Sequence, residues 1–507
     1  MPHPKKIPVI VGVSQFTQFW QEDITLLHPL AMMQRTAEQA IQDTGNPSIR
    51  SLIDTVYVVN ILSYSYADAP QALAEALQIE IKNKFYSAVG GNNPQYLVNK
   101  ACLAIEKGEA EAILIAGAEC MYGMKKALQK GMKLDFPKMQ KPDYISEENP
   151  DGITSFEANY DLFLPAHTYP LFETAYRKAK NRSFEEHQEK IGKIYEKFAQ
   201  TAAKNPYAWT QKAFSIQEIV EPTTENRYIA LPYTKRMVAN IQVDMAASIL
   251  ITNLQHAERL GIPTGHYVCV QGSAQLNDIW DFLQRPNFHQ SLALQQAIPI
   301  ALQQAQLLPE QITHFDFYSC FPIAVEMAMD VLQISENDAR PLSLTGGLSF
   351  FGGAGNNYSL HAIAEAVQTI RHQPDAKVMI TSVGWYMTKI AVGIYSLLPP
   401  QTPFKEQQEI ILKNAQMQIN QQTLPEPTQA YAGEAEIEAY TIICNPQGEP
   451  NKAVLVCKLP QGNRTLALLE QPTNELKNLI TKELVGLKVQ ITHQNEKRTN
   501  YAKIIST

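Results

Sequence analysis

Short apolar runs alternate with helical patterns over the first 120 residues of the chain. The runs lie at residues 7–13 (IPVIVGV), 51–59 (SLIDTVYVV) and 110–119 (AEAILIAGAE) and predict buried strands. Apolar positions at helical spacing predict helices around residues 31–43 and from Pro94 onward. Strand, helix and strand in this order predict a parallel sheet with helical crossovers.

The alternation stops between residues 121 and 239, which are rich in Tyr, Lys and Pro and show helical periodicity only near 184–203. We interpret this stretch as a long insertion before a helix predicted at 243–255 (VDMAASILITNLQ), and insertions of this length are usually functional. The alternation then resumes. The elements predicted there are strands at 265–274, 312–321, 376–385 and 390–398, and a helix at 323–332.

Two stretches of the chain resemble each other, residues 90–119 and residues 352–384. Each runs through a glycine pair, an asparagine pair, an amphipathic helix, a charged turn and an apolar strand. The order of features and the apolar faces of the two helices match, which predicts a duplicated α/β unit.

The composition changes after Pro399. Residues 401–430 are rich in Gln and Pro and predict a linker with one short helix. Residues 431–507 predict three strands, a helix and two strands, the element order of an OB-like barrel, although a simple two-stranded appendage is the alternative. The predicted division is an N-terminal half at 1–270 including the insertion at about 121–239, a C-terminal half at 271–400, the linker, and the OB-like β domain.

Length, composition and charge narrow the class of protein. A chain of 507 residues predicts more than one core, and 45% apolar with 18% charged residues is typical of a globular protein. The net charge of −7 argues against a nucleic-acid partner. Since no apolar stretch approaches roughly 20 residues, we expect no membrane partner and a cytoplasmic location.

The six cysteines form neither C-x-x-C pairs nor the spacing of zinc ligands. They lie in apolar strand-like or helical surroundings, which predicts buried, reduced thiols. No metal site is expected from this pattern.

The two glycine turns are candidates for ligand binding, because each lies where a strand meets a helix N-terminus. Glycine allows close approach of a backbone, and the helix dipole favours a phosphate or a thioester oxygen. Tight packing of helix on sheet is the alternative explanation. The residues are Gly90, Gly91, Asn92 and Asn93 in the first turn, and Gly352, Gly353, Asn356 and Asn357 in the second.

The order of these elements resembles the thiolase superfamily over about residues 5–400. The segments that carry the resemblance are AILIAGAE, VDMAASILI, FDFYSCFPIA, GGLSFFGGAGNN and VGIYS. Within that superfamily the chain is similar to thiolase-like proteins related to the sterol-carrier-protein-x type, which have an extra C-terminal domain. The resemblance implies an α/β fold of two similar halves in a five-layer αβαβα sandwich, acyl transfer, and an acyl-CoA thioester as ligand with no separate cofactor. It also leaves a homodimer possible.

The residues by which thiolases act are almost all replaced. The position of the nucleophilic cysteine falls at or next to Gly91, and the Gly-His-Pro turn corresponds to residues 352–354. The Asn-Glu-Ala-Phe segment corresponds to residues 318–321, where the phenylalanine alone matches. The second cysteine corresponds to Gly384 or a neighbour, beside Trp385, which we include among the ligand-contacting candidates. Ordinary thiolytic turnover is therefore not expected.

Other residues near these turns could supply chemistry. Cys320 and His361 could form an activated nucleophile pair, and Tyr318 with Tyr358 could act as acid and base, as thiolase-fold aldolases also lack the cysteine. Packing roles are the alternative for all four. Arg227 and Lys235 of the insertion could bind the phosphates of CoA, with Trp209 against the adenine.

Three functions follow from these candidates. The first is an acyltransferase with a displaced nucleophile, for which the resemblance implies an acetyl-CoA acetyltransferase of lipid metabolism. The second is a retro-aldol lyase that acts on a CoA thioester through tyrosine. The third is a protein that binds acyl-CoA without catalysis.

Overall fold

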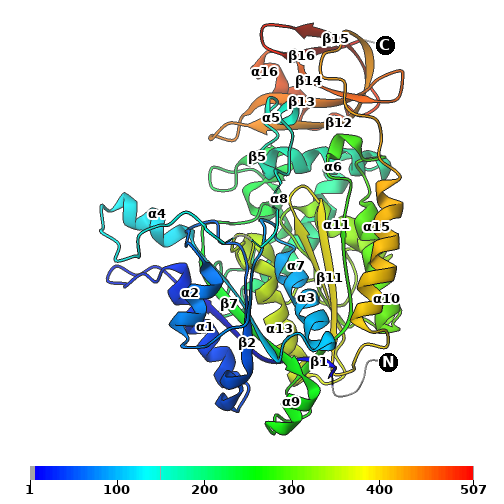
Figure 1. Ribbon diagram of the computed structural model, residues 1–507. Coiled ribbons are helices and arrows are strands. Elements are labelled where there is room, and N and C mark those ends of the chain that lie inside the picture. Colours follow the sequence, from blue (N-terminus) through cyan, green and yellow to red (C-terminus); the bar gives the residue numbers. More distant parts are fainter. Residues whose placement is uncertain (1–5, 145, 149, 506–507) are drawn as a thin grey trace.

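A computed structural model describes residues 6–144, 146–148 and 150–505 (Figure 1). Its largest feature is a sheet of nine strands in the order β3-β2-β4-β7-β1-β8-β11-β10-β9. The strands are β1 (Pro8–Thr17), β2 (Ile53–Val58), β3 (Asn83–Tyr86), β4 (Ala112–Cys120), β7 (Asp244–Asn253), β8 (Val268–Asn277), β9 (His314–Asp316), β10 (Val378–Gly384) and β11 (Lys389–Ser396).

The sheet consists of two halves that meet where β1 lies beside β8. These two strands pair over two residues only, Val9 with Cys269 and Ile10 with Val268. Helices α3 (Asn93–Lys107) and α13 (Tyr358–His372) contact strands of both halves and form the central layer. The outer layers are α1 (Pro29–Asp43) with α2 (Ala69–Ala76) on one half, and α10 (Leu292–Ala305) on the other. The predicted five layers are thereby confirmed.

The direction of the strands differs from the prediction of a parallel sheet. β2 pairs in parallel with β3 and β4, and β9 with β10, but all other neighbours in the large sheet are antiparallel. The helical crossovers predicted between β1, β2 and β4 are present. The sheet is mixed because β7 runs antiparallel to β4 and β1, and β11 runs antiparallel to β8 and β10.

The prediction of a helix at 243–255 is wrong. These residues form strand β7 in the middle of the first half-sheet, followed by the short helix α9 (Leu254–Arg259). β7 is buried on both faces between α1 and the central layer, so its sequence is a continuous apolar run without alternation. Periodicity alone does not separate such a strand from a buried helix.

The predicted repeat is visible as two matching units. Helices α3 and α13 have 15 residues each, both follow a glycine turn, and they lead into β4 and β10 respectively. Both helices contact each other in the central layer. The two turns at their N-termini are therefore brought to the same region of the molecule.

The insertion is mostly helical. Its elements are α4 (Met121–Gln129), α5 (Ser155–Ala158), α6 (Pro165–Ala179), α7 (Phe184–Ala202), α8 (Ile216–Val220), β5 (Tyr228–Leu231) and β6 (Tyr233–Thr234). The helix predicted near 184–203 is confirmed as α7, which begins with a capping box of Ser183 and Glu186. Helix α6 was not predicted, because Pro170 inside it and a nearly complete burial hide its periodicity.

The C-terminal domain is a closed β-barrel. Its strands are β12 (Gly433–Cys444), β13 (Pro450–Lys458), β14 (Arg464–Leu469), β15 (Lys488–Gln494) and β16 (Thr499–Ile504), with α16 (Thr473–Leu476) between β14 and β15. The pairing β12-β13-β14-β16-β15-β12 closes the barrel, with β14 and β16 parallel. This order confirms the OB-like prediction.

The barrel is attached to the insertion. β5 extends the sheet by pairing with β12 through Ala230 and Leu231. Thr174 of α6 both donates to the carbonyl oxygen of Tyr440, at 2.9 Å, and accepts from its N–H, at 3.1 Å. Figure 1 shows the barrel above α6, away from the nine-stranded sheet.

The segment predicted as a linker contains more helix than expected. Residues 404–420 are helical throughout, as α14 (Phe404–Glu406), the π-helix η6 (Gln407–Leu412) and α15 (Lys413–Asn420). Four buried apolar side chains fix this run to the core: Phe404, Leu412, Ala415 and Ile419. Figure 1 shows it lying along the body of the molecule.

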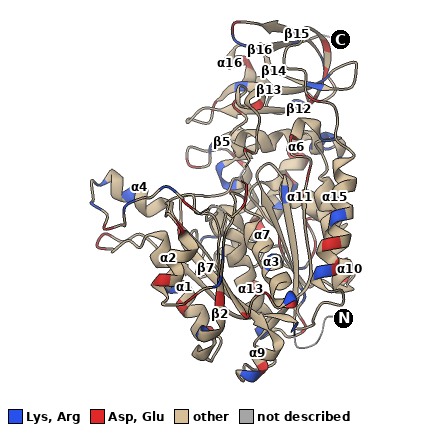
Figure 2. Ribbon diagram, viewed as in Figure 1, with Lys and Arg blue, Asp and Glu red and all other residues tan. Residues whose placement is uncertain are grey.

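Charges of both signs are interspersed along the ribbon in the view of Figure 2. No helix within the described residues is long and apolar enough to cross a membrane.

Candidate functional site

The two glycine turns lie against each other. Gly90 donates its N–H to Oδ1 of Asn356 at 2.9 Å, and Asn356 in turn donates to the carbonyl oxygen of Asn60 at 3.0 Å. Ser359, in the first turn of α13, is 3.4 Å from the carbonyl oxygen of Gly91. The structure therefore brings the first turn to Asn356 and the start of α13, whereas Gly352 and Gly353 lie against residues 239–245.

Some groups of the two turns that were expected to bind a ligand form hydrogen bonds within the protein instead. Gly90 is bonded to Asn356, and Gly353 donates its N–H to the carbonyl oxygen of Asn240 at 2.8 Å. Asn357 reaches across to the carbonyl oxygen of Gly117 at 2.8 Å. These bonds hold the turns to the sheet, so tight packing accounts for these particular groups.

Tyr318 fills the space where Gly91 would carry a side chain. A methyl group placed on Cα of Gly91 would lie 1.9 Å from the hydroxyl oxygen of Tyr318 and 2.6 Å from the carbonyl oxygen of Val383. Tyr318 is 6% exposed and its N–H donates to Thr381. The space beside residue 91, where the resemblance predicts the nucleophile, is thus occupied by a phenol that follows β9, and no side chain fits on residue 91 beside it.

Tyr358 lies next to Tyr318 but is bound into a buried network. The two rings meet edge to face, with centroids 5.6 Å apart. The Tyr358 hydroxyl donates to Asp316 at 2.9 Å, and Asp316 also accepts from Ser343 and from the N–H of Thr345. Burial raises the pKa of Asp316 and of Tyr358. Of the two tyrosines, Tyr318 is the one whose hydroxyl lies at the vacated position.

Cys320 and His361 do not form a nucleophile pair in this structure. Burial raises the pKa of the Cys320 thiol to about 12, and its side chain lies beside Tyr169. His361 is 3.0 Å from Oε1 of Gln15 through Nδ1, and its Nε2 has no partner among the described residues. Burial lowers the pKa of His361 to about 3. Each side chain has its own neighbours, and no hydrogen bond joins them.

The predicted phosphate-binding residues lie elsewhere. Arg227 donates to the carbonyl oxygens of Tyr228, at 3.1 Å, and Asn445, at 3.5 Å, so it serves the junction with the barrel. Lys235 is exposed at the start of the short helix η3 (Lys235–Met237). Neither residue contacts the glycine turns in the described part of the chain.

Two tryptophans do lie near the turns. Trp209 stacks on Phe19, with ring centroids 5.7 Å apart, and lies 3.6 Å from a methyl group placed on Gly352. Trp385 has a left-handed backbone with φ of 55°, and its indole N–H is buried without a partner among the described residues. Its ring is covered by Gly152 of the insertion, where no larger residue would fit.

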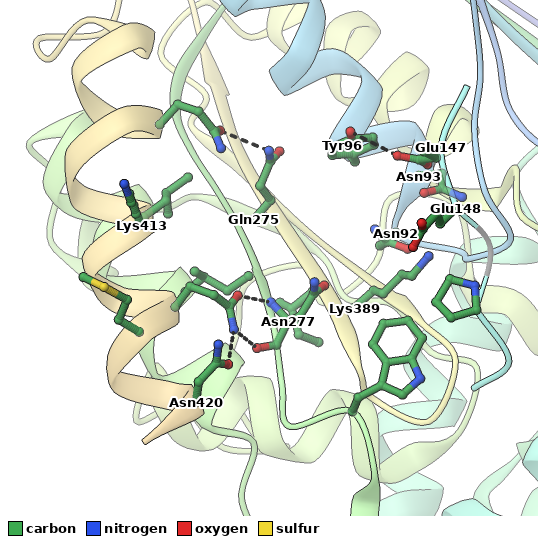
Figure 3. A pocket seen from close by; sticks show the side chains of 18 residues that line it. Asn92, Asn93, Tyr96, Glu147, Glu148, Gln275, Asn277, Lys389, Lys413 and Asn420 are labelled. Atoms are coloured by element: carbon green, nitrogen blue, oxygen red, sulfur yellow. Dashed lines mark hydrogen bonds between the residues drawn. The ribbon is translucent and has the colours of Figure 1, made fainter. Parts of the chain in front are cut away.

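A cavity of about 720 Å³ opens beside the N-terminus of α3 (Figure 3). Its walls come from α3, the insertion, β8, the start of β11 and the helical run 404–420. The lining residues are Asn92, Asn93, Tyr96, Glu147, Glu148, Pro150, Gln275, Leu276, Asn277, Trp280, Lys389, Ile390, Gln408, Leu412, Lys413, Gln416, Met417 and Asn420. Asn92 and Asn93 connect this cavity, which we call the α3 pocket, to the first glycine turn.

Lys389 is a residue of this pocket that the sequence interpretation missed. Its ammonium group donates to the carbonyl oxygen of Val89 at 3.1 Å and lies 5.8 Å from the ring of Trp280. Burial lowers the pKa of Lys389. A lysine that opens an otherwise apolar strand, as in KIAVGIYS, is the signal that could have identified it.

Comparisons with known proteins show which family model and which solved structures this chain resembles. Residues 414–496 match the family model "Thiolase-like protein type 1 additional C-terminal domain". The crystal structure of a monomeric SCP2-thiolase-like protein type 1 from Mycobacterium smegmatis is similar over 98% of this chain and 99% of that one, with 27% identity and a TM-score of 0.82. The chain is a thiolase-like protein with an additional C-terminal domain.

More distant structures share the fold of this thiolase-like protein. The "Ltp2-ChsH2(DUF35) aldolase" has 17% identity over 78% of this chain and 98% of its own, with a TM-score of 0.60. Acetyl-CoA acetyltransferase from Syntrophomonas wolfei has 13% identity over 77% of this chain and 99% of its own, with a TM-score of 0.56. No curated protein matches the sequence.

Outside the α3 pocket, the thiolase-like protein buries Glu173, His187 and Glu326 close together, a set of metal-ligand types. His187 lies 2.6 Å from Glu173 through Nε2 and 3.3 Å from Arg182 through Nδ1. A guanidinium can only donate hydrogen bonds, so Nδ1 of His187 accepts from Arg182. The ring proton of His187 is then on Nε2, which donates to Glu173. Because that proton occupies the nitrogen a metal would need, we interpret the set as a hydrogen-bond network.

Proposed function

We propose that this thiolase-like protein binds an acyl-CoA thioester without forming an acyl-enzyme at the position of the thiolase nucleophile. The observation that supports the proposal is the hydroxyl of Tyr318, which would be 1.9 Å from any Cβ on residue 91. Thiolytic acyl transfer requires a thiolate at such a position. Here that volume holds a phenol, and the residue beneath it has no side chain.

A displaced thiol is a weak substitute. The thiolate of cysteine is its reactive form, and the pKa of Cys320 is raised to about 12, opposite to the shift that activates a nucleophile. His361 would have to act as base, but no hydrogen bond joins it to Cys320, and its Nδ1 lies 3.0 Å from Oε1 of Gln15. An acetyltransferase reaction through Cys320 is therefore the less favoured candidate.

The fold and the α3 pocket support a thioester ligand. The solved structures with this fold include a protein titled acetyl-CoA acetyltransferase. The pocket volume of about 720 Å³ lies within the range of about 300–1,000 Å³ that small-molecule sites occupy. It adjoins Asn92 and Asn93 at the helix N-terminus, where a thioester oxygen would find partial positive charge.

Isothermal titration calorimetry with CoA and acetyl-CoA, together with a thiolysis assay on acetoacetyl-CoA, tests the proposal. We expect saturable binding of both ligands and no cleavage of acetoacetyl-CoA above the rate without protein. Absence of binding would reject the proposal, and turnover that is abolished by alkylation of thiols would replace it with the acyltransferase.

A retro-aldol lyase is the second candidate, favoured by the pairing of Tyr318 and Tyr358. A phenol whose pKa is raised by burial, as that of Tyr318 is, stays protonated and suits a general acid. This activity would be insensitive to thiol alkylation and would be lost in Tyr318→Phe. A lyase reaction that persists unchanged in Tyr318→Phe would exclude tyrosine catalysis.

A further inference from the structure

Strand β8 has a free edge along its second half. One edge pairs with β11 from Cys269 to Asn277, whereas the other edge pairs with β1 only at Val268 and Cys269. Beyond that point β1 and β8 diverge, and α3 and the helical run 404–420 flank the uncovered edge. A free strand edge presents main-chain N–H and C=O groups that need partners.

Side-chain amides satisfy this edge at two positions. Gln407 donates to the carbonyl oxygen of Ser273 at 2.9 Å. Gln416 accepts from the N–H of Asn277 and donates to its carbonyl oxygen, both at 2.8 Å, as a neighbouring strand would. Figure 3 marks the hydrogen bonds that join Gln275 and Asn277 of β8 to the helical run 404–420.

Gln275 lies between these two positions on β8. Ser273 and Asn277 both turn their main-chain groups to the free edge, and in an extended strand every second residue turns them the same way. Gln275 therefore directs its N–H and C=O to this edge as well. No side chain of the described residues bonds these two groups, and Gln275 lines the α3 pocket.

We infer that the α3 pocket binds an extended chain that carries secondary amides, one of which pairs with the main chain of Gln275. A secondary amide has one donor and one acceptor, which can pair with the C=O and the N–H of a residue on a strand edge. The inference rests on the proposed function in one respect, because the pantetheine arm of a CoA thioester is such a chain. A peptide shares the same chemistry.

The lining of the pocket favours a neutral chain over an anion. Two carboxylates, Glu147 and Glu148, balance the ammonium groups of Lys389 and Lys413. Seven further lining residues are carboxamides, Asn92, Asn93, Gln275, Asn277, Gln408, Gln416 and Asn420, and the others are apolar or aromatic. Asn92 is 7% exposed, and its Oδ1 is buried against Gly90 and Gly384 without a partner in the described chain.

The pocket also assigns a role to the C-terminal region. The wall opposite α3 is built by Gln408, Leu412, Lys413, Gln416, Met417 and Asn420. The match to the additional C-terminal domain begins at residue 414, within this helix. The extra domain therefore contributes a wall of a binding site, besides the barrel itself.

The inference is tested by calorimetric titration of the full chain and of two variants. The ligands are pantetheine, CoA and the tripeptide of alanine. Met417→Trp adds bulk at the mouth of the pocket, where Met417 is 48% exposed, and Gln418→Trp adds the same bulk on the exposed neighbour outside the pocket. We expect Met417→Trp to weaken binding of pantetheine at least tenfold and Gln418→Trp to change it less than twofold. Both sites are exposed, so both variants should fold.

The outcomes separate this inference from the proposed function. If CoA binds but Met417→Trp binds it and pantetheine as tightly as Gln418→Trp does, the inference is overturned and the proposed function stands. If the tripeptide binds in a Met417-dependent way and CoA does not, the amide site is supported and the proposed function fails. Absence of binding by all three ligands overturns both.

Discussion

At the scale of the residue, Gly91 and Tyr318 share one volume at the start of α3. Because Gly91 has no side chain, the space next to its Cα is open, and the phenol of Tyr318 fills it. The sequence suggested both as candidates, Gly91 from the repeat and Tyr318 from its expected place near the glycine turns. Their contact joins residues far apart in the chain, so no local pattern could predict it.

Replacement of Gly91 by Ala should destabilise the protein by roughly 1–3 kcal/mol through overpacking against Tyr318. In a Tyr318→Ala background the added cost of Gly91→Ala should fall, but not vanish, because the carbonyl oxygen of Val383 remains 2.6 Å from the new methyl group. Denaturant unfolding of the four proteins measures this coupling. Gly265→Ala is the control, since nothing lies within 4 Å of a methyl group there. Equal costs in both backgrounds would refute the contact.

The buried His361 should make stability depend on pH. Its pKa is lowered to about 3 in the folded protein, against about 6.5 unfolded, so the unfolded state binds the extra proton between these values. Stability contributed by the neutral imidazole is present above pH 6.5 and is lost as the pH falls toward 3. In His361→Phe the free energy of unfolding should fall less over this range, whereas His372→Phe, at an exposed position, should leave the slope as in the wild type. An unchanged slope in His361→Phe would contradict the burial.

At the scale of the element, the sequence predicted the alternation of strands and helices well where amphipathic faces or turns mark their limits. The failures have physical causes. β7 is buried on both sides and shows no period, and α6 is nearly all buried around an internal proline. The α3 pocket was not predicted because its walls come from α3, β8 and α15, which meet only in the fold.

Docking of the barrel on α6 should depend on Thr174, which bonds both main-chain groups of Tyr440. Thr174→Val keeps the shape but leaves buried groups unsatisfied, which costs about 1–3 kcal/mol. The expected result is a lower thermal midpoint for the whole chain. Thr201→Val, which loses only a bond to Lys197 within α7, is the matched control. Equal midpoints for the two variants would show that this junction contributes little.

At the scale of the whole molecule, one of the two edges of the nine-stranded sheet is covered by the chain itself. β3 forms that edge, and Tyr86 donates its N–H to Ser146 at 2.7 Å while Ala88 donates to Glu147 at 2.8 Å. Tyr144 bonds the carbonyl oxygen of Lys84 at 2.7 Å. An edge bonded in this way is not available for strand pairing with a second copy.

We therefore expect a monomer, although the sequence left a homodimer open. The similar structure from Mycobacterium smegmatis is titled monomeric. Sedimentation equilibrium should give a mass near 56.8 kDa at all concentrations tested. A concentration-dependent species of twice that mass would show that another surface associates.

The absence of an acyl-enzyme is the claim on which the functional account depends. Mass spectrometry of the intact protein after incubation with acetyl-CoA, followed by peptide mapping of all six cysteines, tests it most directly. The account predicts an unmodified mass while acetyl-CoA is bound. An acetyl adduct on Cys320 that forms faster than on the unfolded chain would contradict it.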